Sequence, residues 1–260
     1  MKIYIPTRGR ADDQVTLSFF PESLRKEVVL VIDSDEEHLY KDKYDCQFMV
    51  IPEDIKGIAK KRQYIHKHTD DKKIVMLDDD LRFYIRKSDN DWHLRYLEPN
   101  EYPALFGLLD VWLDDYAHVG VSAREGNNRV EKLAVENIRY MRVLGYNLDM
   151  FDGIELGRVQ VKEDFDINLQ LLRQGKPSKI SYYYAQGQKS SNAAGGCSEW
   201  RTIDVHNQGA LTLQSLHPDF VKVVEKETKT AWGGQPRKEV NVQWKRAFNS
   251  GADLKQGGLF

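Results

Sequence analysis

Three consecutive aspartates, Asp78, Asp79 and Asp80, are the side chains in this sequence best suited to chemistry. They come directly after Ile74–Leu77, an apolar run of strand length. Neighbouring carboxylates repel one another, and the repulsion is costly unless they share a cation. Oxygen ligands of this kind suit Mg²⁺ or Mn²⁺, and the bound metal would hold the phosphates of a substrate. The alternative is an acidic turn or helix start that binds nothing.

A basic helix start lies upstream of the aspartates. Gly57 precedes Ile58–His68, which we expect to be helical, and Lys60, Lys61 and Arg62 fall in its first turns. The free N–H groups at the start of a helix, with cations nearby, suit phosphate oxygens. Basic residues on a helix also commonly face solvent. The place of this helix, just before the aspartates, favours the phosphate site.

Two further polar groups stand in the second half of the chain. Glu163 and Asp164 open an expected helix, Lys162–Gln174, where a carboxylate serves either as a general base or as a partner of the helix dipole. His206 is either a further metal ligand or a structural histidine, and His217 is the weaker candidate for ligation.

Alternating strands and helices position these residues in the first half of the chain. The expected strands are Lys2–Pro6, Val28–Ile32, Phe48–Pro52 and Ile74–Leu77. The expected helices between them are Ala11–Phe20, Asp35–Lys43 and Ile58–His68. Continuous apolar runs of this length are typical of strands buried on both faces of a parallel sheet, and ligands bind at the carboxyl ends of such strands. The pattern predicts an α/β fold with a mostly parallel central sheet flanked by helices.

The second half has a looser pattern. The expected helices there are Tyr102–Tyr116, Lys162–Gln174 and Pro218–Thr228. The expected strands are His118–Ala123, Asn137–Leu144 and Ile180–Tyr184. We expect a loop or irregular hairpin at Arg82–Glu98, and a loop at Gln186–Cys197 that either covers the acceptor or lies on the surface. The predicted division is one domain at 1–217 and a basic helical extension at 218–260 packed on it.

Composition excludes several classes of protein. Of the 260 residues, 41% are hydrophobic and 30% are charged, which supports a packed core and excludes global disorder. The net charge is −2, so any binding to nucleic acid must come from a local patch. No apolar run is long enough to span a membrane, and the start has no signal-peptide pattern. The distant pair Cys46 and Cys197 argues against a disulfide scaffold or a cysteine zinc site. We expect a cytoplasmic protein with no membrane partner and no obligate protein partner.

The order of these motifs resembles the glycosyltransferases of the GT-A fold. The resemblance rests on the G-x-x-x-x-R segment at Gly57–Arg62, followed by an apolar strand that ends in D-x-D, with Asp78 and Asp80 as the outer pair. It implies a GT-A-like domain whose amino-terminal half binds a nucleotide-sugar, expected to be a UDP-sugar. It also implies a Mn²⁺ or Mg²⁺ ion on the diphosphate of that donor.

The resemblance assigns roles to individual residues. It implies that Asp80 contacts the metal and that Asp78 contacts the ribose or metal-bound waters. It makes Asp164, ahead of Glu163, the general base of an inverting reaction, and His206 a further metal ligand. The residues that it places around the nucleotide-sugar are Thr7, Arg8, Arg10, Asp33, Gly57, Lys60, Arg62, Asp78 and Asp79.

Four segments narrow the resemblance to the TET-associated glycosyltransferases of bacteriophages: P-T-R-G-R, G-I-A-K-K-R, M-L-D-D-D and K-E-D-F-D. This similarity covers most of residues 1–210. It implies transfer of a sugar to a hydroxymethylated pyrimidine, 5-hydroxymethylcytosine, in phage DNA, within the host cytoplasm. Two alternatives stay open: a GT-A enzyme with a protein or glycan acceptor, and a nucleotidyltransferase-like enzyme. The latter usually has a glycine-rich loop with a lysine after the first strand, whereas Thr7–Arg10 contains one glycine.

The carboxyl-terminal segment offers cations and indole rings for DNA. The predicted DNA-binding residues are Arg237, Lys238, Lys245, Arg246, Trp232 and Trp244. Cations neutralise phosphates, and an indole stacks on an exposed base. The alternative is an ordinary solvated tail whose tryptophans pack on the core.

Overall fold

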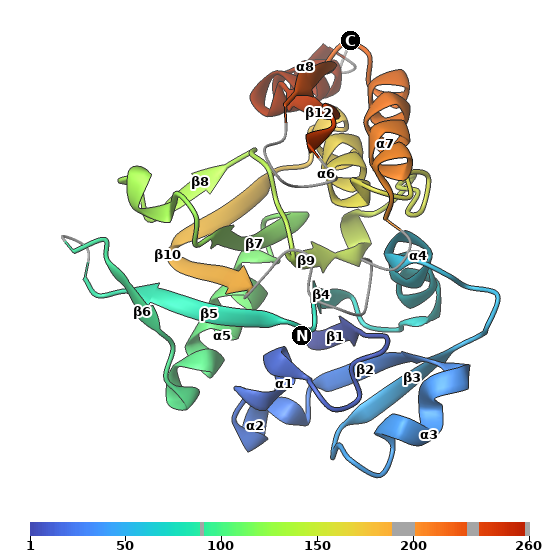
Figure 1. Cartoon of the computed structure of the whole chain (residues 1–260). Helices are drawn as coiled ribbons and strands as arrows, with labels where there is room; N and C mark the ends of the chain where they lie inside the picture. The colour runs from blue at the N-terminus through green and yellow to red at the C-terminus, as the bar shows by residue number, and fades with distance from the viewer. Residues whose placement is uncertain (89–90, 189–200, 228–233, 258–260) are drawn as a thin grey trace.

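A computed structural model of the chain shows an α/β fold built on one ten-stranded sheet (Figure 1). It describes residues 1–88, 91–188, 201–227 and 234–257. The strands of these residues are β1 (Lys2–Pro6), β2 (Val28–Asp33), β3 (Gln47–Ile51), β4 (Lys73–Leu77), β5 (Leu81–Arg86), β6 (Leu94–Tyr96), β7 (His118–Ala123), β8 (Ala134–Glu136), β9 (Val143–Asn147), β10 (Ser178–Gln188), β11 (Val221–Lys226) and β12 (Arg237–Val242). The α-helices are α1 (Val15–Ser18), α2 (Glu22–Arg25), α3 (Glu37–Tyr40), α4 (Ile58–His68), α5 (Tyr102–Trp112), α6 (Glu163–Arg173), α7 (Ile203–Leu216) and α8 (Trp244–Gly257).

The sheet has the strand order β3-β2-β1-β4-β9-β7-β10-β5-β6, and β8 pairs with β10. Its first four strands are parallel, as predicted. Strands β7 and β10 run in the same direction as these four, whereas β9, β5 and β8 are reversed. The carboxyl ends of β1, β2 and β4 therefore meet at one edge, which is where ligands bind in such sheets.

Alternate residues of the buried strands pack on opposite faces of the sheet. In β1, Ile3 and Ile5 join one hydrophobic core, and Tyr4 joins the other. The first core includes residues of α1, α2 and α5, and the second includes residues of α4 and α6. Burial on both faces explains why these strands are continuous apolar runs in the sequence.

Helix α6 connects the sheet to the carboxyl-terminal elements. Ile167 and Leu171 pack in the second core, while Phe165, Leu169 and Leu172 belong to a third cluster with residues of α7, β11, β12 and α8. Figure 1 shows α6, α7, α8 and β12 gathered at one end of the molecule, away from β1 to β3. The face that Phe165, Leu169 and Leu172 share is thus covered by the carboxyl-terminal elements.

The predicted helix at Pro218–Thr228 is wrong, because this segment contains strand β11, which pairs antiparallel with β12. Hydrophobic residues at Val221, Val223 and Val224 are β-branched, and their partners lie on a strand that follows later in the chain. The extension is therefore a hairpin followed by α8, and the division after residue 217 stays a prediction. Helix α7 was not predicted.

Other boundaries also differ from the sequence prediction. Strand β10 includes residues 186–188, the start of the expected loop, and the expected helix Asp35–Lys43 is a short 3₁₀ helix followed by the single turn α3. The expected strand Asn137–Leu144 is replaced by β9, which begins at Val143, because Asn137 and Arg142 adopt left-handed backbone conformations with φ of 56° and 65°. The expected helix Ala11–Phe20 contracts to the single turn α1. The Arg82–Glu98 region is a hairpin, formed by β5 and β6.

Within the described ranges, no helix is long and apolar enough to cross a membrane.

Candidate active site

The residues that follow β1 and β4 touch each other at the carboxyl edge of the sheet. Thr7 Oγ1 donates a hydrogen bond to Asp79 Oδ2 over 2.6 Å, and both side chains are buried. Gln14 Nε2 donates in turn to Thr7 Oγ1 over 2.8 Å. The first and fourth strands thus bring the predicted donor residues Thr7 and Asp79 together.

Two arginines supply positive charge to the three aspartates. Arg10 forms an ion pair with Asp79, and its Nη1 lies 3.2 Å from Asp80 Oδ2. Arg62 Nη2 lies 3.1 Å from Asp78 Oδ1. Desolvation raises the pKa of Asp78 to about 6, and Arg62 acts in the opposite direction. The two arginines therefore offset part of the repulsion among the carboxylates, while Asp79 and Asp80 still contribute to the raised pKa of Asp78.

A second group of charges surrounds Asp33 at the end of β2. Asp33 is 1% exposed and forms ion pairs with Lys61 and Arg8. Lys61 Nζ also donates to the backbone oxygen of Thr7 over 3.2 Å, and Arg8 Nη2 lies 3.1 Å from Asp35 Oδ2. The structure therefore unites Thr7, Arg8 and Asp33, all predicted from the sequence, in one network.

The lysine of this network is Lys61, whereas the sequence prediction selected Lys60. Lys60 is exposed on α4, while Lys61 and Arg62 are 5% and 4% exposed. The signal was present in the sequence, because the buried Ile65 follows Lys61 by one helical turn and shares its face. Gly57 lies at the helix start as expected, with a φ of 86° that favours glycine.

Glu36 was missed by the sequence prediction. Its carboxylate accepts a hydrogen bond from the backbone nitrogen of Gly9 over 2.9 Å. The bond holds the turn that carries Arg8 and Arg10. Glu36 ends the short 3₁₀ helix Ser34–Glu36, within the helix expected at Asp35–Lys43, but its partner Gly9 is far away in the sequence, so no local pattern predicts this contact.

Arg62 joins the aspartates to the acidic pair at the start of α6. Its Nη1 forms a buried ion pair with Glu163, while its Nη2 binds Asp78. Burial raises the pKa of Glu163, and the Arg62 guanidinium opposes the shift. Asp164 is only partly buried and accepts a hydrogen bond from the Phe165 backbone nitrogen over 3.0 Å. The D-x-D segment and the Glu-Asp pair, far apart in the sequence, therefore belong to one site.

A profile of the TET-associated glycosyltransferases matches residues 1–196. The chain belongs to this family. It is accordingly a glycosyltransferase, as the motifs indicated, and the family assignment made from the sequence is confirmed.

Two bacteriophage proteins are similar to this glycosyltransferase in sequence. Both are named β-glucosyl-HMC-α-glucosyl-transferase, one from Enterobacteria phage T6 and the other from phage T2. The T6 protein is 24% identical over 237 residues, which cover 85% of this chain and 81% of the relative. The T2 protein is 25% identical over 236 residues, with the same coverage of 85% and 81%.

Solved glycosyltransferases share the fold. Glucosyl-3-phosphoglycerate synthase from Mycobacterium tuberculosis, solved with Mn²⁺, UDP and phosphoglyceric acid, has a TM-score of 0.52 and 11% identity, covering 93% of this chain and 86% of that one. Residues 1–349 of S. aureus TarS, solved with UDP-GlcNAc, have a TM-score of 0.51 and 14% sequence identity. The match covers 82% of this chain and 67% of the TarS chain. These similarities confirm the predicted GT-A-like fold.

Two of the three aspartates fit a divalent metal. No hydrogen bond or ion pair from the described side chains reaches Asp78 Oδ2 or Asp80 Oδ1. Hard carboxylate oxygens of this kind suit Mg²⁺ or Mn²⁺. Asp79 is held by Thr7 and Arg10 instead. In the part of the chain that is described, no group of three or more His, Cys, Asp or Glu side chains is arranged to hold a metal. The carboxylates of Asp78 and Asp80 are therefore the candidate metal ligands, and this role stays a prediction.

His206 lies on α7 beside a different carboxylate. Its Nε2 is 3.4 Å from Glu239 Oε1, and its Nδ1 is 3.3 Å from Arg201 Nη2. Glu239 also binds Lys162 Nζ over 3.1 Å, and Lys162 directly precedes the acidic pair of α6. The structure thus brings His206 toward the start of α6 through Glu239. Its role as a metal ligand stays a prediction.

The predicted DNA-binding residues of the tail have partners within the protein. Arg237 Nε lies 2.9 Å from Glu239 Oε1, and Lys238 Nζ lies 3.2 Å from Glu225 Oε1. Arg246 Nη1 donates to the Asp219 backbone oxygen over 3.3 Å. The exposed Lys245 is the cation of the four best placed to meet a ligand.

The two tail tryptophans differ in what the structure shows. Trp244 packs on Phe165 with ring centroids 5.3 Å apart, within the third cluster. This contact gives Trp244 a structural role, and base stacking by it stays a prediction. Trp232 and most of the predicted loop Gln186–Cys197 lie outside the described residues.

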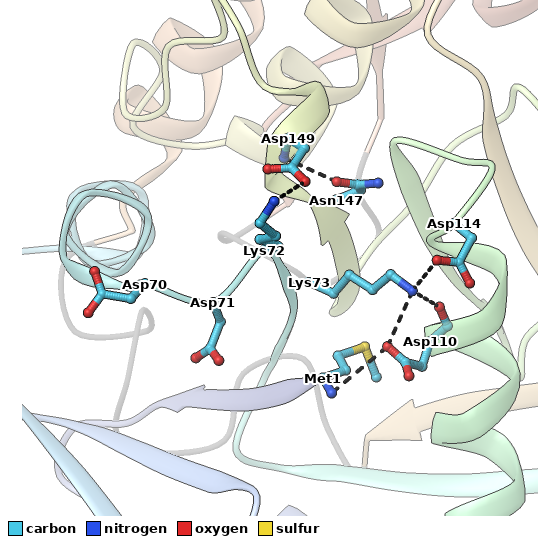
Figure 2. A pocket seen from close by; sticks show the side chains of 9 residues that line it. All are labelled: Met1, Asp70, Asp71, Lys72, Lys73, Asp110, Asp114, Asn147 and Asp149. Carbon is cyan, nitrogen blue, oxygen red and sulfur yellow. Dashed lines mark hydrogen bonds and ion pairs between the residues drawn. The ribbon is translucent and has the colours of Figure 1, made fainter.

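A groove lies at the opposite edge of the sheet, at the amino ends of β1 and β4 (Figure 2). Its lysines are already paired: Lys72 Nζ lies 3.0 Å from Asp149, and Lys73 Nζ lies 2.6 Å from Asp114. The residues that line it are Met1, Asp70, Asp71, Lys72, Lys73, Asp110, Asp114, Asn147 and Asp149. None of the predicted site residues belongs to this groove.

Proposed function

We propose that this enzyme transfers a sugar from a UDP-sugar to 5-hydroxymethylcytosine in phage DNA, with a divalent metal and with inversion at the sugar. The observation that carries the proposal is the double ion pair of Arg62, which places the acidic pair of α6 beside the D-x-D aspartates. The T6 and T2 relatives, whose names specify HMC, support the acceptor. Action on phage DNA would take place in the host cytoplasm.

The amino-terminal network is suited to the donor. Arg8, Arg10, Lys61 and Arg62 present four cations at the edge where β1, β2 and β4 end. A diphosphate that displaces their carboxylate partners would gain charge-assisted hydrogen bonds, and Asp33 would be free to accept bonds from the base. Asp78 and Asp80 would hold Mn²⁺ or Mg²⁺, which neutralises charge on the departing UDP.

Asp164 is the better placed of the two candidate bases. Glu163 is committed to Arg62, whereas Asp164 is partly exposed at the start of α6. In the proposed step the acceptor hydroxyl oxygen bonds to the anomeric carbon as the bond from that carbon to the diphosphate breaks. Asp164 takes the hydroxyl proton, and UDP leaves with the bonding electron pair.

The relatives suggest a second acceptor. Their name describes transfer to β-glucosyl-HMC, a base that already carries a sugar. The test is a UDP-release assay with four acceptors: DNA containing hydroxymethylcytosine, the same DNA after β-glucosylation, unmodified DNA, and a protein or glycan mixture. UDP release with hydroxymethylcytosine DNA alone supports the proposal. UDP release with the β-glucosylated DNA alone would make β-glucosyl-hydroxymethylcytosine the acceptor. Release with protein or glycan alone overturns both.

The anomeric form of the product tests inversion separately. An inverting enzyme converts an α-linked donor sugar into a β-linked product, which NMR of the released nucleoside distinguishes. An α-linked product from an α-linked donor would overturn the role of Asp164 as base of an inverting step.

A further inference from the structure

An aromatic pair with one exposed ring lies on the hairpin that follows the aspartates. Tyr84 on β5 and Tyr96 on β6 are directly opposite each other, and their rings stack with centroids 4.9 Å apart. Tyr96 is 53% exposed, whereas Tyr84 is buried beneath its neighbours. The opposite side of β5, with Leu81 and Phe83, belongs to the first core. The tyrosine pair therefore lies on the side of the sheet that faces away from that core.

Two arginines flank the tyrosines. The Arg82 guanidinium lies 5.7 Å from the centre of the Tyr96 ring, and that of Arg124 lies 5.6 Å from the centre of the Tyr84 ring. Among the described residues, Arg82 has no carboxylate within ion-pair distance, and Arg124 reaches only Glu125, at 3.9 Å. We call Arg82, Tyr84, Tyr96 and Arg124 the aromatic-arginine face.

Gly187 permits the close packing of this face. It lies opposite Arg82 in the pairing of β10 with β5. A Cβ atom at position 187 would be 3.3 Å from the Tyr84 ring and 3.4 Å from Arg124 Cβ. The absent side chain lets Tyr84 and Arg124 approach each other over the strand.

The aromatic-arginine face borders the candidate active site. Arg82 comes two residues after Asp80. On the other side, the Arg124 backbone nitrogen donates to Gln186 O over 2.7 Å, and the Gln186 side chain accepts from Arg142 Nη1 over 3.3 Å. The backbone oxygen of Arg142 accepts from the Asp78 nitrogen over 3.1 Å. Short contacts thus connect both arginines to the aspartates.

We propose that the aromatic-arginine face binds the acceptor DNA, with phosphates on Arg82 and Arg124 and a base stacked on Tyr96. The proposal rests on the proposed function and gives it a binding surface. Arg82 has no carboxylate partner among the described residues, and Arg124 has only the long, exposed contact with Glu125, so both guanidinium groups suit phosphates, while an exposed aromatic ring suits the face of any base. Cross-strand aromatic pairs also stabilise hairpins, but that role requires neither the exposure of Tyr96 nor an arginine beside each ring.

The first test measures DNA affinity at several salt concentrations. Replacing both arginines, Arg82→Gln with Arg124→Gln, should reduce the slope of log affinity against log salt by about 1.8 on duplex DNA, or about 1.4 on a single strand. The matched control is Lys41→Gln with Lys72→Gln, which removes the same charge from exposed lysines elsewhere, with side chains 52% and 77% exposed. This control should keep the wild-type slope.

The ring of Tyr96 is tested in the same assay. Tyr96→Ala should weaken DNA binding about 5- to 160-fold, which corresponds to the loss of stacking with one base, whereas Tyr96→Phe should keep most of the affinity. UDP binding should be unchanged in every variant, because the donor network contains none of these residues. Equal losses in Tyr96→Ala and Tyr96→Phe would overturn the stacking role.

Crosslinking of the wild-type protein avoids any dependence on variant folding. Ultraviolet crosslinking to hydroxymethylcytosine DNA, followed by peptide mass spectrometry, should label the peptide that carries Tyr96. Labelling confined to residues 237–246 would overturn the proposal and leave the DNA acceptor intact. A wild-type enzyme that binds no DNA and transfers sugar to a protein or glycan would instead overturn the proposed function.

Discussion

The donor half and the carboxyl-terminal region use their charged residues in opposite ways. In the first half, ion pairs join distant segments: Arg10 reaches Asp79, and Arg62 reaches Glu163. In the tail, cations pair with near neighbours, as Arg237 does with Glu239 and Lys238 does with Glu225 across the hairpin. Ion pairs between distant segments bring polar side chains together at the carboxyl ends of the strands. Ion pairs between neighbouring residues of the two-stranded sheet mainly stabilise that sheet.

The largest expected effect is at the D-x-D pair. Asp80→Ala should abolish turnover with the fold intact, and Asp78→Ala should nearly do so, because the charge of the departing diphosphate is no longer neutralised. Turnover is measured by UDP release, and folding by thermal unfolding. Asp149→Ala, at the opposite edge of the sheet, is the matched control. Full activity after removal of divalent metals by a chelator would contradict the metal role.

The second effect separates the two acids of α6. Asp164→Asn should lower kcat about 10²- to 10⁴-fold with donor affinity little changed, because only the proton acceptor is lost. Glu163→Gln should instead lower the stability of the fold, because Arg62 loses one of its two carboxylate partners and keeps only Asp78. Normal turnover of Asp164→Asn would move the base to Glu163 or Asp166, and loss of donor binding would place Asp164 at the nucleotide.

A third effect is the pH dependence of stability, which we expect from the contact of Asp166 on α6 with His217. Burial alone would raise the pKa of Asp166, but hydrogen bonds from His217 and Arg158 lower it below its usual range. A carboxyl with a depressed pKa stabilises the fold above its unfolded pKa, about 4, and this stabilisation is lost as the pH falls further. Urea unfolding should show this loss below about pH 4, and the same slope in Asp166→Asn would contradict the assignment.

The smallest effect is expected in the tail. Replacing Arg237, Lys238, Lys245 and Arg246 together should weaken DNA binding and reduce the salt slope by about 0.9, the contribution of the exposed Lys245, for which the described part of the chain offers no ion-pair partner. Donor affinity should stay unchanged. A reduction near 3.6, which corresponds to four phosphate contacts, would make the tail the main DNA surface. The aromatic-arginine face would then lose its role.

The same contrast explains what the sequence predicted. Strands β1, β2 and β4 are buried on both faces, so apolar runs marked them and the polar residues at their ends. Strand β11 has one covered side and mixed residues such as Lys222 and Glu225, so its pattern also fits a helix. The metal-binding role of Asp78 and Asp80 could be predicted from the local sequence alone, because both follow an apolar strand.

Contacts between distant segments were not accessible in the same way. Two ion pairs, Arg62 with Glu163 and Lys61 with Asp33, form only because α4 packs against the sheet. Lys60 as a donor residue stays a prediction, whereas the burial of Lys61 follows the helical phase that Ile65 marks. The aromatic-arginine face was missed because Tyr84 and Tyr96 become neighbours only through the pairing of β5 with β6.

Mass spectrometry of DNA nucleosides tests the central claim most directly. DNA that contains hydroxymethylcytosine is incubated with the enzyme, Mn²⁺ and a panel of UDP-sugars, then digested to nucleosides. One donor should add the mass of its sugar to hydroxymethylcytosine, unmodified DNA should stay unchanged, and Asp80→Ala should produce no adduct. Transfer of sugar to a protein or glycan acceptor, with no adduct on any DNA, would contradict the claim.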